Sequence, residues 1–202
     1  MVWWRGFQSN AEKVAQGERV RGAPRDAALR IFEVTGSVLA IYSEARGSGI
    51  RMMHNVLIRP AVMSERQALE SLQRRASLNN PGDREALLAN PDAIELPPDQ
   101  IAAGQVFVAE RDGAIVGFSA VLPREDPETD LDGLFVEPHL WGHGIGRLLV
   151  EYCVVFARAQ GSAALHVVGN PHAEGFYKAC GFEMLGTVDT RFGVGLSFRR
   201  TL

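Results

Sequence analysis

The chain has 202 residues, of which 46% are hydrophobic and 22% charged, and its formal net charge is −3. This length suits one folded domain with room for an appendage. A mildly acidic chain gives no reason to expect nucleic acid as a partner, because such binding depends on neutralising phosphates. The two cysteines, Cys153 and Cys180, fall on apolar faces of expected helices, where we expect them to act as small hydrophobic side chains without a disulfide.

The first 52 residues differ in pattern from the rest. Residues 1–10 contain tryptophans and an arginine in place of the apolar core of a signal peptide. Residues 31–42 are interrupted by polar side chains and are fewer than the ~20 that span a bilayer. We therefore expect a cytoplasmic protein without membrane contact. Residues 1–52 are expected to be either a disordered extension or a mis-assigned start, and residues 53–202 the folded domain.

Apolar periodicity and turn residues indicate alternating strands and helices in this domain. Asp112-Gly113 is a strong hairpin signal, and Gly161 and Gly181 end the two later helices. The segment 79–100 is rich in Asn, Pro and Asp and indicates a substrate-side loop. The expected strands are 55–59, 105–110, 114–122, 131–136, 163–168, 183–189 and 193–198, and the expected helices begin near Ser64, Arg84, Ile145 and Pro171.

A glycine-rich turn follows the strand at 131–136 and opens an amphipathic helix. Gly142, Gly144 and Gly146 let the main chain approach a ligand closely, so that successive N–H groups can converge on phosphate oxygens. The first turn of the helix adds unpaired N–H groups and a positive dipole end. A dinucleotide fingerprint would need another glycine where Arg147 stands, and no Gly-Lys-Ser/Thr follows, which excludes a nucleotide P-loop. The alternative is a turn that only packs helix against strand.

The helix after these glycines has an apolar face and a charged face. We expect Arg147 and Glu151 to form an i, i+4 pair on the charged face. The strand at 163–168 follows this helix, and the order strand, helix, strand predicts parallel pairing through a right-handed crossover. An α/β fold with a mixed sheet is the expected class. The apolar face consists of Ile145, Leu148, Leu149, Tyr152, Phe156 and Ala159.

Two segments carry a family resemblance. Residues 136–149 read V-x-P-x-x-W-G-x-G-I-G-R-L-L, and residues 170–182 read N-x-x-A-x-x-F-Y-x-x-x-G-F. In this order they resemble the GNAT N-acetyltransferases over residues 53–202, with a departure at Trp141, where the family more often has Gln or Arg. The resemblance implies a GNAT fold: a mixed central sheet of six to seven strands with flanking helices, in which acetyl-CoA is wedged where two central strands splay apart.

The resemblance also implies how acetyl-CoA binds. Main-chain N–H groups of the turn bind the pyrophosphate, so that Trp141 leaves the mode of binding intact. The main chain of Phe135 and Val136 lies along the pantetheine arm, where an N–H polarises the thioester carbonyl. Asn170 contacts the cofactor, although an Asn before a Pro is equally a favoured helix N-cap. The implied cofactor-binding residues are Phe135, Val136, Trp141, Gly142, His143, Gly144, Ile145, Gly146, Arg147, Asn170 and Tyr177.

Three side chains are candidates for proton transfer. By resemblance, Tyr177 is the general acid that protonates the departing CoA thiolate, while its place on an apolar helix face also suits a core residue. Period-2 alternation places Asp130 and Asp132 on one face with Leu134 and Val136, where either carboxylate could take the proton of a substrate ammonium. The alternative for both is a solvated strand edge. No metal site is expected, because no His and Cys spacing of a zinc site is present.

These observations predict an acetyl-CoA-dependent N-acetyltransferase. The expected reaction is a direct attack of a primary amine, from a small molecule or a peptide, within a ternary complex. The acidic balance of the folded part favours a cationic amine. The alternative is a non-catalytic module that binds acyl-CoA as a sensor. We expect acetyl-CoA and an amine as partners, no nucleic acid or membrane, and a monomer or homodimer.

Overall fold

The computed structural model describes residues 56–202. The predicted N-terminal extension, residues 1–52, lies outside the described residues. The elements in chain order are β1 (Val56–Pro60), η1 (Met63–Glu65), α3 (Arg66–Asn79), α4 (Pro81–Ala89), η2 (Pro91–Ala93), α5 (Pro98–Ala102), β2 (Val106–Arg111), β3 (Ala114–Pro123), β4 (Thr129–Val136), η3 (Pro138–Leu140), α6 (Ile145–Ala159), β5 (Ala164–Gly169), η4 (Pro171–Ala173), α7 (Glu174–Ala179), β6 (Glu183–Thr190) and β7 (Gly193–Thr201). None of the described helices combines the length and the apolar composition needed to cross a bilayer.

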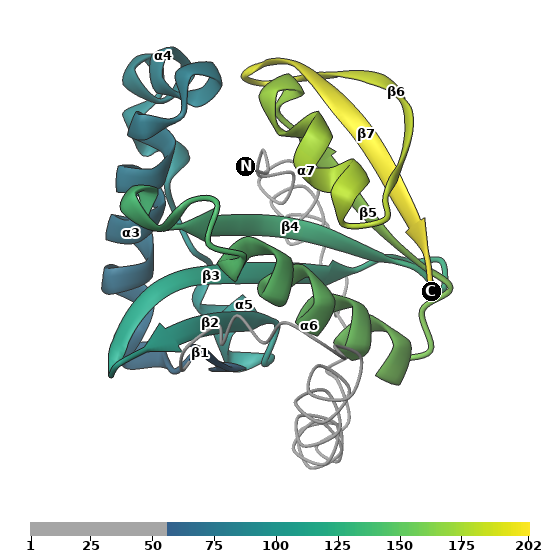
Figure 1. The fold of residues 1–202 in the computed structure, drawn as a ribbon, viewed down its shortest axis with the longest axis horizontal. Coiled ribbons are helices and arrows are strands. Elements are labelled where there is room, and N and C mark those ends of the chain that lie inside the picture. The colour runs from purple at the N-terminus through teal and green to yellow at the C-terminus, as the bar shows by residue number, and fades with distance from the viewer. Residues whose placement is uncertain (1–55) are drawn as a thin grey trace, which may run out of the picture.

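The strands form one 7-stranded sheet in the order β1-β2-β3-β4-β5-β7-β6 (Figure 1). The pairing of β4 with β5 is parallel, and the neighbouring pairs are antiparallel. The predicted hairpin is present, because Asp112 and Gly113 both have positive φ, 52° and 77°, between β2 and β3. The expected mixed sheet and the crossover through α6 are thus confirmed.

The central strands β4 and β5 pair over a short distance and then separate. Their register consists of Thr129 opposite Leu165 and Asp130 opposite His166. Beyond Asp130, β4 continues to Val136 without a β5 partner. Figure 1 shows the two strands together at one end and apart at the other. The predicted splay is therefore present, and it leaves an edge of β4 main chain open toward β5.

The sheet is covered on both faces by apolar side chains. One cluster packs α6 and α7 against the sheet, and it includes Leu149, Tyr152, Phe156 and Tyr177. The second cluster packs α3 and α5 against the opposite face of β2, β3 and β4. The helix α6 has the predicted apolar face, since Ile145, Leu149, Tyr152 and Phe156 are all buried. Burial on both faces fixes the position of β4 between the two helical layers.

A β-bulge interrupts β4 at Asp132. Ala120 of β3 pairs with Gly133, but the next residue, Val121, pairs with Leu131. Asp132 is thus the extra residue on the β4 side of the pair. A bulge of this kind bends its strand and breaks the alternation of side chains between the two faces.

The bulge makes one sequence prediction wrong. Leu131 and Leu134 are three residues apart, and both pack on the α6 side together with Val136. Asp130 precedes Leu131 and so faces the other side of the sheet. Asp132 also faces that side, because its carboxylate accepts a hydrogen bond from an amide of α5. The two aspartates share a face with each other but not with Leu134 and Val136.

The segment 79–100 is more ordered than predicted. Besides the expected short helix, here α4, it contains η2 and α5. Leu96 and Ile101 are buried in the cluster that packs α3 and α5 against the sheet. Their burial explains why this segment forms short helices against the sheet in place of a loop. The Asn, Pro and Asp residues that favour a loop are also good starts for short helices.

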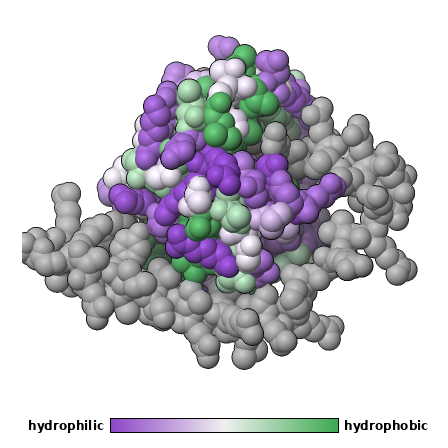
Figure 2. Space-filling view, turned by 90° about the vertical axis from the view of Figure 1, so that its right-hand side faces the viewer, coloured by the Kyte–Doolittle hydropathy of each residue, from purple (hydrophilic) through white to green (hydrophobic). Residues whose placement is uncertain are grey.

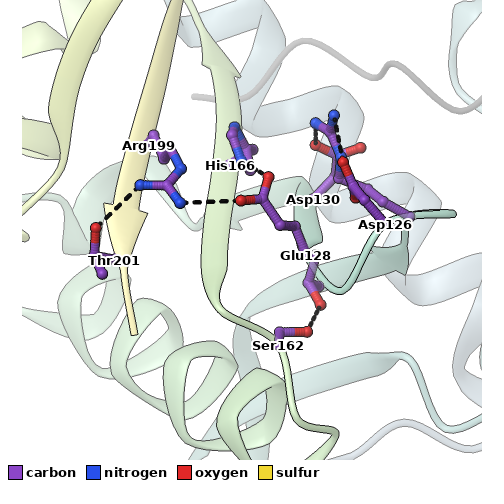
Figure 3. Close-up of polar contacts among 9 residues, drawn as sticks. Asp126, Glu128, Asp130, Ser162, His166, Arg199 and Thr201 are labelled. Carbon is purple, nitrogen blue, oxygen red and sulfur yellow. Dashed lines mark hydrogen bonds and ion pairs between the residues drawn. The ribbon is translucent and has the colours of Figure 1, made fainter.

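Charged side chains join the strands where β4 and β5 run together. Glu128 accepts hydrogen bonds from His166 of β5 (2.5 Å) and Arg199 of β7 (3.0 Å). The hydroxyls of Thr129 and Ser162 lie 2.6 Å apart, which ties the start of β4 to the turn before β5 (Figure 3). The face at this end is largely hydrophilic (Figure 2). We call Glu128, His166 and Arg199 the closed-end cluster, since it links three strands at the unsplayed end.

Candidate acyl-coenzyme A site

The turn after β4 brings the main chain sharply into α6. Gly142 and Gly144 have φ of 77° and 83°, a region that side chains with Cβ rarely adopt. The indole Nε1 of Trp141 donates to the carbonyl oxygen of Val136 at 2.8 Å and so fixes the turn to the end of β4. His143 is exposed and its ring lies 3.0 Å from the Trp141 carbonyl. The predicted turn residues thus form one continuous loop beyond the splayed strand.

The N-terminus of α6 is suited to bind an anion. Its N-cap is Gly144, so no side chain caps the helix. The first backbone bond runs from the N–H of Leu148 to the oxygen of Gly144, which leaves the preceding N–H groups of the turn without intrahelical acceptors. No acidic residue lies in the first turn of α6. These donors fit a diphosphate, which needs several N–H groups and a positive helix end.

The third glycine of the turn has a packing role. A Cβ on Gly146 would lie 3.3 Å from two ring atoms of Phe176 on α7. Gly146 therefore allows α7 to approach the first turn of α6. This close approach brings the residues of the second sequence motif next to the glycine turn, as the resemblance implies.

Arg147 does not form the predicted pair with Glu151. The carboxylate of Glu151 instead accepts hydrogen bonds from Arg200 of β7 at 2.8 and 3.1 Å. None of the ion pairs among the described residues includes Arg147, whose side chain is exposed beside the helix start. Its positive charge adds to the attraction of this end of α6 for an anion.

Tyr177 lies on α7 beneath the splay and is fully buried. Its ring packs against Phe176, Phe182 and Phe198, with ring centroids 5.1, 5.7 and 5.3 Å away. Its hydroxyl has no hydrogen-bond partner among residues 56–202. Burial above all, and then the negative charges near it, raise the pKa of this hydroxyl well above its ordinary value. The Tyr177 hydroxyl therefore keeps its proton at neutral pH, and burial of an unsatisfied hydroxyl costs free energy.

Asn170 caps the helical turn after β5, as one of the two interpretations predicts. Its Oδ1 accepts from the N–H of His172 at 2.9 Å. Its Nδ2 donates to Oδ1 of Asp83, on α4, at 2.7 Å. Both ends of the carboxamide thus have partners within the protein. A contact with a cofactor would share or replace one of them.

The two aspartates of β4 have separate surroundings. Asp130 is part of an ion pair with Arg124 at 3.4 Å. Asp132 is only 2% exposed, and its Oδ2 accepts from Nε2 of Gln100 at 3.3 Å. Both lie at the splay, on the face of α5 rather than of α6. Their predicted role as a base stays a prediction.

The two cysteines are buried and free, as expected. Burial raises the pKa of Cys153 to about 12 and that of Cys180 to about 11. Neither thiol loses its proton near neutral pH, which leaves both without nucleophilic thiolate. In the described part of the chain, no three His, Cys, Asp or Glu side chains are grouped to hold a metal ion.

Comparison with known proteins decides the family. The model of the acetyltransferase (GNAT) family matches residues 68–182, which contain the glycine turn, α6 and the Tyr177 helix. The chain belongs to this family. The seven-stranded mixed sheet with its splayed central strands agrees with the fold that the sequence resemblance implies.

Two curated GNAT relatives are similar over part of their length. The aminoglycoside N(6')-acetyltransferase type 1 of Stenotrophomonas maltophilia is 35% identical over 94 residues, 41% of this chain and 61% of that protein. The peptidyl-lysine N-acetyltransferase YjaB of Salmonella typhimurium is 39% identical over 93 residues, 46% of this chain and 59% of that protein. The chain thus spans about three fifths of the curated relatives it matches.

A solved GNAT structure shows the same fold. The PaiA N-acetyltransferase of Thermoplasma acidophilum, in complex with coenzyme A, has a TM-score of 0.60 and 16% identity, and the match covers 73% of this chain and 99% of that one. At this identity the likeness concerns the fold alone.

Sequence reasoning on this GNAT chain missed two residues of the site. Asp83 lies 87 residues before its partner Asn170, and no local pattern links the two. Gly169 lies under the ring of Tyr177, because a Cβ there would be 2.6 Å from Cε2 of that ring. A glycine at the end of a buried strand, directly before Asn-Pro, is a signal of close backbone approach that could have indicated Gly169.

Proposed function

We propose that the protein is an acetyl-CoA-dependent N-acetyltransferase that transfers the acetyl group to a primary amine by direct attack in a ternary complex. One observation carries the proposal: the open edge of β4 beyond Asp130 runs from the closed end of the splay to the uncapped N-terminus of α6. A thioester carried on a long arm can lie along this open main chain with the diphosphate at its other end beside the helix N-terminus. Family membership supports the same chemistry.

The residues of the glycine turn bind the diphosphate in this proposal. Main-chain N–H groups from Gly144 to Arg147 donate to its oxygens, and Trp141 keeps the turn attached to Val136. Acetyl-CoA supplies an activated acyl group on a thiol leaving group. The main chain of Phe135 and Val136 lies along the pantetheine arm, where an N–H donates to the thioester oxygen as negative charge develops.

Tyr177 is the general acid in this proposal. Its hydroxyl keeps its proton at neutral pH because burial raises its pKa. Among the described residues, this hydroxyl donates to no hydrogen-bond acceptor. It can therefore give that proton to the leaving thiolate. Asp130 or Asp132 assists loss of the amine proton, either directly or through water. Asn170 positions the start of η4, which leads into the Tyr177 helix.

The acceptor is a primary amine. The names of both curated relatives describe transfer to a nitrogen, of an aminoglycoside in one case and of a peptidyl lysine in the other. Since both acceptors carry amines that are cationic at neutral pH, we propose a cationic amine for this chain as well. A cytoplasmic location and a monomer or homodimer stay predictions.

The test is release of free thiol from acetyl-CoA by the purified full chain. The acceptors are kanamycin, a lysine-containing peptide and spermidine, each against a reaction without amine. We expect amine-dependent thiol release and a product heavier by one acetyl group in mass spectrometry. Binding of coenzyme A by calorimetry without thiol release from any amine would instead support the acyl-CoA sensor module. Absence of coenzyme A binding would reject both.

A further inference from the structure

The carboxylate of Asp83, on helix α4, lies beside the end of β5 where β4 and β5 are apart. Asp83 belongs to α4, yet its Oδ1 accepts a hydrogen bond from Asn170 Nδ2 at 2.7 Å. Asn170 directly follows Gly169, the last residue of β5. The carboxylate of Asp83 therefore lies beyond the end of β5, where β5 has separated from β4.

Asp83 lies within electrostatic reach of the proposed acid. The charge of Asp83 is among the causes that raise the pKa of the Tyr177 hydroxyl. That hydroxyl is fully buried and has no hydrogen-bond partner. An acceptor nitrogen must approach the acyl group close to the atom that Tyr177 protonates. A group bound to Asp83 would be next to that place.

Within residues 56–202, the side chains that donate hydrogen bonds to the Asp83 carboxylate are neutral amides. Asn170 and Asn80 both hydrogen-bond to its carboxylate, and His172 lies near it. None of the ion pairs with Arg or Lys in residues 56–202 includes Asp83. Desolvation has the largest influence on its pKa, and the net shift is upward. A partly buried carboxylate that forms no ion pair with Arg or Lys gains from a cation that enters the site.

The aspartates of β4 have other partners. Asp130 pairs with Arg124, and Asp132 accepts from Gln100 beneath α5. The charge of Asp130 is thus balanced by a cation, and Asp132 lies on the α5 side of the sheet. Asp83 differs from Asp130 because it forms no ion pair with Arg or Lys among residues 56–202, and it differs from Asp132 because its donor Asn170 directly follows the end of β5.

We propose that Asp83 binds the ammonium group of the acceptor beside Tyr177 and so selects amines that are cationic at neutral pH. This inference rests on the proposed acetyl transfer and names the acceptor class of the same site. Asp83 acts by binding and orienting the amine, with Asn170 and Asn80 fixing the direction of the carboxylate. No atom of Asp83 is transferred.

The experiment compares Asp83→Asn with the wild-type chain in steady-state thiol release, with kanamycin, spermidine and the lysine-containing peptide as probes. Asn keeps an oxygen to accept from Asn170 and loses the charge. We expect KM for the cationic amine to rise roughly 10- to 100-fold, the size expected for loss of a charged hydrogen bond. The dissociation constant of coenzyme A, by calorimetry, should stay within about twofold of wild type.

Asp83→Glu and Asp92→Asn are the matched variants. Asp83→Glu keeps the charge and should recover most of the lost affinity. Asp92 is an exposed acid of η2 paired with Arg191, and its change to Asn should leave KM unaltered. The melting temperature of ligand-free Asp83→Asn should equal or exceed that of wild type, because the variant removes a partly desolvated charge.

The outcomes separate the two proposals. If the wild-type chain acetylates a cationic amine and Asp83→Asn has the same KM, Asp83 does not bind the ammonium. If the wild type acetylates an arylamine that is neutral at pH 7, such as p-anisidine, but none of the three cationic probes, the inferred acceptor class is wrong. If it binds coenzyme A and acetylates no amine at all, the proposed function fails and this inference with it.

Discussion

The buried hydroxyl of Tyr177 costs free energy, because it makes no hydrogen bond among the described residues. It is fully buried without a hydrogen-bond partner, although buried polar groups in proteins are usually paired. A phenylalanine would fill the same aromatic pocket between Phe182 and Phe198. The proposed role as general acid would use the proton of this hydroxyl, which the raised pKa retains at neutral pH.

We expect Tyr177→Phe to separate activity from stability. Turnover should fall by ~10²-fold or more where proton transfer limits the rate. The free energy of unfolding in urea should stay equal or rise, because an unsatisfied buried group is removed. Tyr152→Phe, on α6 against Phe107, is the control and should keep wild-type turnover. Normal turnover in Tyr177→Phe would contradict the role of general acid.

Gly169 should be intolerant of even one added methyl group. The Cβ of Gly169→Ala would lie 2.6 Å from Cε2 and 3.1 Å from Cδ2 of Tyr177, so that the ring must move. We expect a loss of about 1–3 kcal/mol in the free energy of unfolding, as for other overpacked cores, with reduced turnover. Urea denaturation and thiol release measure the two effects.

Gly175→Ala is the matched control for Gly169→Ala. Gly175 lies in α7, two residues before Tyr177, and a Cβ there meets nothing within 4 Å. Alanine in a helix should stabilise by about 0.5–1 kcal/mol relative to glycine. Equal stability of Gly169→Ala and wild type would show that the ring of Tyr177 is not fixed by this contact.

At the scale of elements, helix α6 packs against the sheet along its length and forms part of the proposed diphosphate site at its N-terminus. Its apolar face packs against the sheet, while its uncapped N-terminus faces the end of the splayed strand. Glycines with positive φ lie beyond both ends of this helix, at 142, 144 and 161. The same backbone conformation thus occurs in the proposed ligand-binding turn at one end and in helix termination at the other.

The pair Gly142→Ala and Gly161→Ala tests this division. Both residues have positive φ, 77° and 79°, and an added methyl group would meet open space at either, so each substitution costs only the backbone strain of about 1–2 kcal/mol. We expect both variants to lose similar stability in urea. Only Gly142→Ala should weaken coenzyme A binding in calorimetry, by roughly tenfold, which corresponds to about 1.4 kcal/mol. Equal affinities in the two variants would contradict a ligand-binding role for the turn.

At the scale of the whole molecule, the splay depends on firm closure at the other end. The closed-end cluster joins the segment before β4 to β5 and β7 through Glu128 (Figure 3). The hydrogen bond from Arg199 is the main cause that lowers the pKa of Glu128 below its ordinary value, with a further contribution from His166. The two halves of the sheet are thus joined by the hydrogen bonds of Glu128 at the closed end, and β4 and β5 are unpaired at the other end.

The lowered pKa of Glu128 predicts a dependence of stability on pH. A carboxylate whose pKa is lower in the folded state stabilises the fold above its unfolded pKa, near 4.5, and this contribution is lost as pH falls through the folded pKa. Glu128→Gln should therefore melt at a lower temperature at pH 7 and show a smaller decline between pH 5 and about 3. Calorimetry across this range measures both. The exposed Glu183 of β6 provides the control variant Glu183→Gln, and superimposable curves for Glu128→Gln and wild type would reject the cluster's role.

The sequence by itself determined the local features of this protein. The glycine turn, the hairpin at Asp112-Gly113, the helix α6 and the two motifs are all local patterns, because turn conformation and apolar periodicity depend on neighbouring residues. They were sufficient for the strand order around the crossover and for the family. The helical segments between residues 79 and 100 were predicted less well from the sequence, because their burial depends on contacts with the sheet.

Only the tertiary structure decided which side chains meet. The bulge at Asp132 moved Asp130 and Asp132 to the face of α5, because an extra residue in one strand changes every face assignment before it. The partner of Glu151 became Arg200 in place of Arg147, and Asp83 reached Asn170 across 87 residues. Contacts of this kind arise from the packing of distant elements, and no periodicity within one segment encodes them.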